Sequence, residues 1–150
     1  LVDACISADM FIAAKAVWQV EQLRELYVTF ASSEAIGLSS IASLVHPVGR
    51  DEDHGLGVQM DPEANQKVIA PVAPGLFAQL GIERWDELQL GSTWTPTIDR
   101  GVIALDGERE IEFRAVDKVR LSLDRLGPRV IDVSKALGAA AKHGIMIQNC

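Results

Sequence analysis

GVIALDGEREIEF, residues 101–113, carries the clearest structural pattern in this chain. Two apolar runs rich in β-branched residues flank Asp106-Gly107, a dipeptide that favours a tight hairpin turn. A two-residue loop would set Ile103 opposite Glu110 and mix the two faces of the hairpin. A three-residue or bulged loop instead pairs Ile103 with Ile111 and leaves Glu110 and Glu112 facing solvent. The sequence therefore predicts the longer loop.

Short segments bounded by turns predict further strands over 1–6, 23–30, 68–72 and 118–123. Pro71 restricts the third of these to a sheet edge or a strand end. Short helices are expected within 9–18, 33–45 and 134–143, with Ser33 capping the second, and Asp132 or Ser134 capping the third. Residues 49–57 are expected to form an acidic loop, and 83–99 to be mostly irregular. These patterns predict a mainly β fold, a β-sandwich with a few short helices, in a single domain.

The composition limits the classes of function. The chain has 150 residues and a formal net charge of −7, without a cluster of Lys and Arg, so we expect no nucleic-acid partner. It lacks an apolar run of about 20 residues, so we expect no membrane span. Two cysteines and no signal-peptide pattern favour the cytoplasm. Because the chain opens directly on a strand-like segment, we expect it to be part of a longer protein.

The residue patterns contain no complete catalytic site. There is no phosphate-binding glycine loop, and the three His and two Cys lack the spacing of zinc ligands. His46 and His54 flank the acidic run at 51–53, which is more typical of a solvated loop than of a metal site. The sequence therefore predicts no catalytic residues and no metal ligands.

Two segments have the small residues that a ligand needs for close approach. Gly37, Ser39 and Ser40 lie in a run of small residues at 31–45, and Asp106-Gly107 forms the hairpin turn. We expect the two segments to lie close together and to bind a ligand through backbone N–H groups and the Asp106 carboxylate. The alternative for each is structural: a small-residue helix packed on a sheet, and a turn chosen for its conformation.

The same segments resemble a known family. Residues 101–113, followed by Gly127–Val133 and an Ala-rich helix, look like the C-terminal end of proteins of the ATP-NAD kinase and acetoin-catabolism protein X (AcoX) type. Residues 31–48 are similar in place to the Thr-Pro-Thr-Gly-Ser-Thr-Ala-Tyr segment of NAD kinases. Residues 67–76 resemble the strand-Pro-x-x-Pro stretch that follows there. The resemblance covers nearly the whole chain in order and spacing.

The resemblance implies a two-domain protein of which this chain is the C-terminal, β-rich domain. In such kinases an N-terminal α/β domain has a Gly-Gly-Asp-Gly motif, which this chain lacks. We therefore expect no kinase activity from the chain alone. Gly37 falls at the Gly of the family segment, with Ser39 and Ser40 near its Thr and Ala, while Ile41 replaces its Tyr. Asp106-Gly107 matches the family's Asp-Gly turn.

The implied function is binding of an NAD-like substrate and oligomerisation within an ATP-dependent phosphotransferase. ATP and a divalent metal such as Mg²⁺ are implied for the full-length protein. The implied partners are the N-terminal domain and further copies of the chain, as a homo-oligomer. The alternative is a domain of an AcoX-type protein that binds a small molecule, or serves assembly, without catalysis.

Overall fold

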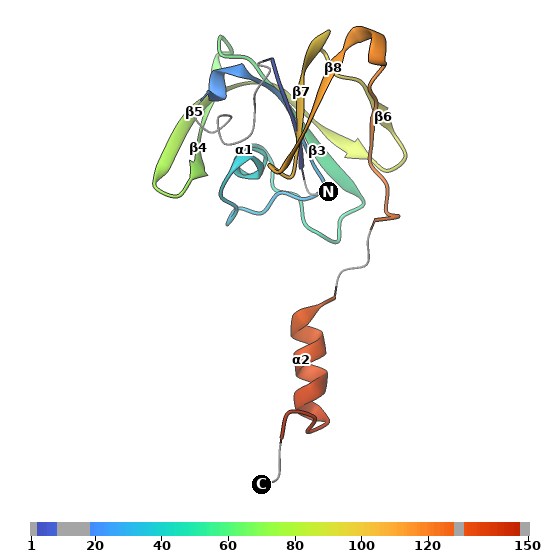
Figure 1. Ribbon diagram of the computed structural model, residues 1–150. Helices are drawn as coiled ribbons and strands as arrows, with labels where there is room; N and C mark the ends of the chain where they lie inside the picture. The colour runs from blue at the N-terminus through green and yellow to red at the C-terminus, as the bar shows by residue number, and fades with distance from the viewer. Residues whose placement is uncertain (1–2, 9–18, 128–130, 148–150) are drawn as a thin grey trace.

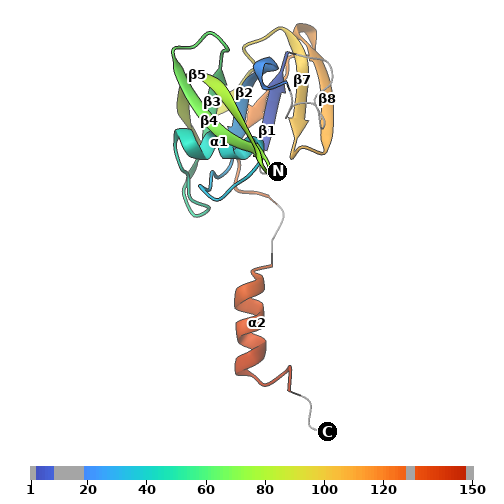
Figure 2. The ribbon, with the colours of Figure 1, turned by 90° about the vertical axis from the view of Figure 1, so that its left-hand side faces the viewer.

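A seven-stranded antiparallel sheet forms the body of the protein (Figures 1 and 2). The computed structural model describes residues 3–8, 19–127 and 131–147. The sheet has the order β4-β5-β3-β2-β1-β7-β8, and a two-stranded ribbon pairs β6 with β9. The strands are β1 (Asp3–Ser7), β2 (Leu23–Val28), β3 (His54–Met60), β4 (Gln66–Ala73), β5 (Leu76–Gln89), β6 (Thr93–Trp94), β7 (Arg100–Leu105), β8 (Arg109–Arg114) and β9 (Leu121–Ser122).

Helices are short and few in the described residues. They are the 3-10 turns η2 (Val20–Gln22) and η3 (Ala115–Asp117), and the α-helices α1 (Leu38–Val45) and α2 (Val133–Lys142). The prediction of a mainly β fold with a few short helices is therefore confirmed. The helix expected within 9–18 lies outside the described residues. No helix in the described ranges combines the length and the apolar character needed to cross a bilayer.

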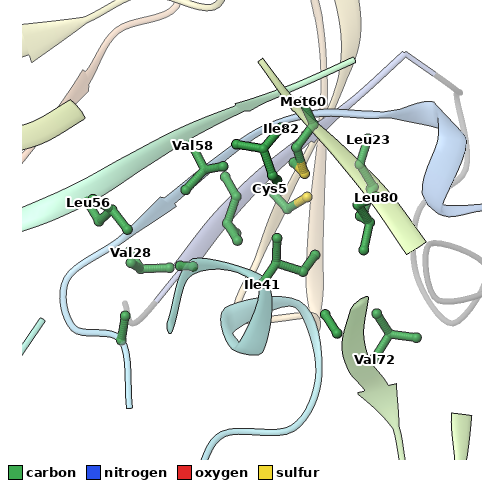
Figure 3. Close-up of a cluster of buried hydrophobic side chains, with 14 of the residues drawn as sticks. Cys5, Leu23, Val28, Ile41, Leu56, Val58, Met60, Val72, Leu80 and Ile82 are labelled. Carbon is green, nitrogen blue, oxygen red and sulfur yellow. The ribbon is translucent and has the colours of Figure 1, made fainter. Parts of the chain in front are cut away.

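One face of the sheet encloses the main core. Alternate side chains from β1, β2, β3, β4, β5 and β7 converge there, and α1 closes the open side with the fully buried Ile41 and Ala42 (Figure 3). Cys5 of β1 points into this cluster, whereas its neighbours Ala4 and Ile6 pack on the opposite face. This alternation follows from the two-residue period of a strand. The second, smaller cluster joins Ala4, Ile6, Ile103 and Phe113.

The predicted hairpin is confirmed in its register. Ile103 pairs with Ile111 and Leu105 with Arg109, so three residues form the loop. Asp106 and Gly107 have φ of 52° and 68°, and the Glu108 N–H donates to the Leu105 carbonyl oxygen at 3.1 Å. Two successive left-handed residues are what a tight hairpin of right-twisted strands requires, and Asp-Gly supplies them at low cost. Glu110 and Glu112 are exposed, as expected.

Other local predictions need correction. The acidic loop ends earlier than expected, because β3 already begins at His54. Residues 83–89 are not irregular but continue β5, a strand of 14 residues. Their exposed polar side chains hide the strand from sequence patterns, because hydrogen bonding to β3 rather than burial holds this part of the strand. The strand expected over 118–123 shrinks to Leu121–Ser122.

Helix boundaries also differ from expectation. α1 begins at Leu38 with Gly37 as its N-cap, so the prediction that Ser33 caps the helix is wrong. Gly37 has φ of 100°, which favours glycine, and its N–H donates to the Pro71 carbonyl oxygen at 3.0 Å. For α2, Asp132 is the cap, since its side chain accepts from the Lys135 N–H at 2.9 Å. Strand β4 is an edge strand, as Pro71 predicts.

Helix α2 stands apart from the sheet (Figures 1 and 2). Its described side chains, and those of residues 143–147, are exposed or at most half-buried. Large apolar side chains among them are therefore open to solvent: Val133, Leu137, Ile145, Met146 and Ile147.

Candidate ligand-binding site

A cavity of about 530 Å³ lies on the sheet face that carries the smaller cluster. Strands β1, β2, β7 and β8 form one wall, and Trp94 with residues 119–123 forms the other. The lining is mostly apolar, with side chains such as Tyr27, Ile103, Ile111 and Leu121. A volume of this size and an apolar lining with few polar groups are typical of sites for small organic molecules.

Asp3 at the start of β1 is among the residues that line this cavity. Burial and the neighbouring negative charge of Asp106 raise the pKa of the Asp3 carboxyl above its usual range. The two residues are also joined through the backbone. The Asp106 N–H donates to the Asp3 carbonyl oxygen at 3.1 Å, and the Asp3 N–H donates to Asp106 Oδ1 at 3.3 Å. The hairpin turn is thereby attached to β1 beside the cavity.

A buried carboxylate connects strand β2 to the segment around Thr97. Glu25 of β2 is fully buried, and its Oε1 accepts from the Thr97 N–H at 2.6 Å and from the Thr97 hydroxyl. Its Oε2 accepts from the hydroxyl of Tyr27, whose ring lines the cavity. Burial and this hydrogen bond to Glu25 raise the pKa of the Tyr27 phenol. Glu25 therefore attaches the segment around Thr97 to the sheet and sets the position of the Tyr27 ring.

The structure places the first predicted binding segment at β4. Ser40 is buried, and its hydroxyl lies 2.7 Å from the Gly37 carbonyl oxygen and 3.3 Å from that of Pro71. The Ser40 hydroxyl therefore bonds to the residue that caps α1 and to strand β4. Ser39 is half-buried on the same turn. Gly37, Ser39 and Ser40 are not among the residues that line the cavity.

The second predicted segment, Asp106 and Gly107, lies at the other end of the sheet from β4, next to Asp3. Asp106 and Gly107 are not among the residues that line the cavity, whereas Asp3, to which Asp106 is hydrogen-bonded, is. The predicted convergence of Gly37, Ser39 and Ser40 with Asp106 and Gly107 on one ligand stays a prediction.

Sequence reasoning missed most of the cavity residues. Tyr27, Trp94 and the segment 119–123 come from three separate parts of the chain, and none has a motif around it. Glu25 offers one usable signal, since a carboxylate between Leu23 and Leu26 within a predicted strand is a charge at a position where burial is expected.

The histidines near the acidic loop make separate contacts. His54 Nε2 lies 3.1 Å from Glu52 Oε2, while the His46 ring stacks on Trp85 with centroids 4.5 Å apart. Across the described ranges, no group of three or more His, Cys, Asp or Glu side chains is arranged to hold a metal ion.

The fold and the cavity define a class: a mainly β domain with a mostly apolar cavity of a size suited to a small organic molecule. Residues 1–126 match the family model of the acetoin catabolism protein X C-terminal domain. The chain is 42% identical over 148 residues to acetoin catabolism protein X of Cupriavidus necator (strain H16). The aligned region covers 97% of this chain and 41% of that protein. No solved structure matches the chain. The chain belongs to the AcoX C-terminal domain family, and it spans about two fifths of the length of this relative.

Proposed function

We propose that this domain binds the nucleoside part of a dinucleotide-like ligand within a larger AcoX-type protein. The observation that carries the proposal is the apolar cavity, whose lining includes Asp3, together with the Asp106 carboxylate that accepts from the Asp3 N–H. An adenine or nicotinamide ring has apolar faces that suit Tyr27, Ile103 and Leu121, and ribose hydroxyls are donors that suit a carboxylate. The resemblance to NAD kinases supports NAD as the substrate, with ATP and a divalent metal acting elsewhere in the full-length protein.

In this proposal the domain positions a substrate and leaves the chemistry to another part of the protein. Phosphoryl transfer depends mainly on orientation and neutralisation of charge, so a domain without catalytic residues can contribute by holding one substrate. A cytoplasmic location belongs to the same proposal, because Cys5 is a free, buried thiol of the kind found in reducing compartments.

Calorimetry of the 150-residue chain with adenosine, NAD, NADP and ATP tests the proposal. Ile111 lines the cavity and is 50% exposed, so Ile111→Trp fills the cavity without disturbing the core. We expect this variant to bind NAD at least about tenfold more weakly. Asp106→Ala is expected to weaken binding by about 1.5–3 kcal/mol, as for a lost hydrogen bond to a charged group.

Val116→Trp is the matched control, since Val116 is 80% exposed and lies outside the cavity lining. It should bind like the unmodified chain. The proposal is wrong if none of the four compounds binds, or if Ile111→Trp binds as tightly as Val116→Trp.

The second candidate function is assembly without a nucleotide. The exposed apolar side chains of α2 and residues 145–147 favour it, because such a stretch is typical of a surface that another protein covers. Light scattering on a truncated chain, described in the Discussion, tests this candidate separately from ligand binding.

A further inference from the structure

A second pocket adjoins the apolar cavity and differs from it in charge. This pocket has a volume of about 300 Å³ and shares Val119 and Arg120 with the cavity. Its ionisable lining residues are Arg114, Lys118 and Arg120 against the single carboxylate of Asp99. Three cations around one pocket contrast with the net charge of −7 of the chain.

Among the described residues, no salt bridge involves the side chains of Arg114, Lys118 or Arg120. The nearby Asp117 carboxylate instead accepts from the Arg114 backbone N–H at 2.7 Å. In the β7–β8 register Arg114 also lies directly opposite Arg100. Like charges at opposite positions do not stabilise a sheet, so this pair of arginines adds positive charge beside the pocket without strengthening the strand pairing.

Lys118 adds an independent observation from the backbone. Its φ is 49°, the left-handed region that non-glycine residues rarely occupy. A glycine at the end of η3 would adopt this conformation more easily, yet the chain has a lysine there and the lysine lines the pocket. Backbone strain of this kind often accompanies a functional role for the side chain.

We propose that the pocket at Arg114, Lys118 and Arg120 binds the phosphate group of a ligand whose apolar part occupies the adjoining cavity. Arg and Lys are the side chains that recognise phosphate oxygens through charge-assisted hydrogen bonds. Arg120 lies at the junction, where it reaches the phosphate next to the nucleoside. The inference rests on the proposed function, and it specifies which residues bind the phosphate part of the ligand.

Calorimetric titration of the 150-residue chain with inorganic pyrophosphate, adenosine and ADP tests this subsite. The buffer contains EDTA and little salt, so that any binding is independent of metal. We expect pyrophosphate to bind, and ADP to bind about tenfold more tightly than adenosine. Arg120→Gln should weaken pyrophosphate binding about tenfold. Arg109→Gln, which removes a cation from β8 outside both pockets, should leave it unchanged.

Lys118→Gly separates binding from folding. It should weaken pyrophosphate binding while raising the melting temperature by about 2–4 °C, because glycine relieves the left-handed strain. A purely structural role for Lys118 predicts no change in binding.

The remaining outcomes distinguish this inference from the proposed function. Equal pyrophosphate affinity of Arg120→Gln and the unmodified chain overturns the anion subsite. ADP binding no tighter than adenosine overturns the subsite and leaves the nucleoside cavity standing. Pyrophosphate binding without adenosine binding overturns the nucleoside cavity and leaves the subsite standing.

Discussion

Asp3 and Asp106 lie beside one another where β1 meets the end of β7. The pKa of Asp3 is raised above 3.8 by burial and by the Asp106 charge. The folded protein therefore binds the proton of the Asp3 carboxyl more tightly than the unfolded chain does. The contribution of the protonated Asp3 carboxyl to the stability of the fold is fully present below the unfolded pKa. This contribution is lost as pH rises through the higher folded pKa.

Asp106→Asn tests this pair, because asparagine keeps an oxygen acceptor for the Asp3 N–H and removes the charge. We expect the melting temperature at pH 7 to rise by roughly 1–3 °C, the scale of a partly exposed charge interaction. Circular dichroism melts across pH should show the gain shrinking as pH falls toward 3.8. A gain that is the same at every pH would show that charge is not its cause.

At the scale of elements, Glu25 connects strand β2 to the segment around Thr97. Three donors surround its fully buried carboxylate, two of them from Thr97 and one from Tyr27. Removing the carboxylate leaves buried donors without an acceptor, which costs more than the hydrogen bonds themselves. The segment thus depends on one side chain for its attachment to the sheet.

Glu25→Ala is expected to lower the free energy of unfolding by about 3 kcal/mol, and Thr97→Val by about 1 kcal/mol. Urea denaturation followed by circular dichroism measures both. The double variant should lose less than the sum, since the two residues share the same interaction. Glu87→Ala, an exposed carboxylate on β5, is the control and should change stability by less than about 0.5 kcal/mol. A Glu25→Ala chain as stable as this control would remove the case for the attachment.

At the scale of the whole molecule, α2 and residues 143–147 add exposed apolar surface to a domain whose core closes without them. Neither of the two buried clusters includes a residue of this segment. The family model also ends at residue 126, before α2 begins. The segment is therefore expected to serve contacts outside this domain.

A chain truncated after Gly127 tests this expectation. We expect the 150-residue chain to be a dimer or larger by light scattering at tens of micromolar, and the truncated chain to be monomeric. The melting temperature should stay within about 2 °C, since the described residues that are removed, 131–147, are all exposed or at most half-buried. A monomeric full chain, or a truncated chain that still associates, would contradict this role of the segment.

Local sequence patterns determined the features that depend on neighbours along the chain. The apolar–polar alternation on either side of Asp106-Gly107 predicted the register of β7 and β8, and Pro71 restricted β4 to a sheet edge or a strand end. The cap of α2 was narrowed to Asp132 or Ser134, of which the structure shows Asp132. Each is decided within a few residues, by the conformations available to Gly and Asp or by the missing N–H of proline. The order of these elements also carried the family resemblance, which the AcoX match confirms.

Tertiary structure alone decided the cavity, the adjoining pocket lined by Arg114, Lys118 and Arg120, and the long β5. Tyr27, Trp94 and Leu121 meet because the sheet brings distant strands together, and a hydrogen bond joins Glu25 to Thr97 across 72 positions. The polar half of β5 is a strand because β3 pairs with it, although its own side chains lack an apolar face. Local periodicity reports which side chains are buried, whereas pairing and cavity walls depend on contacts between remote segments that the pattern does not encode.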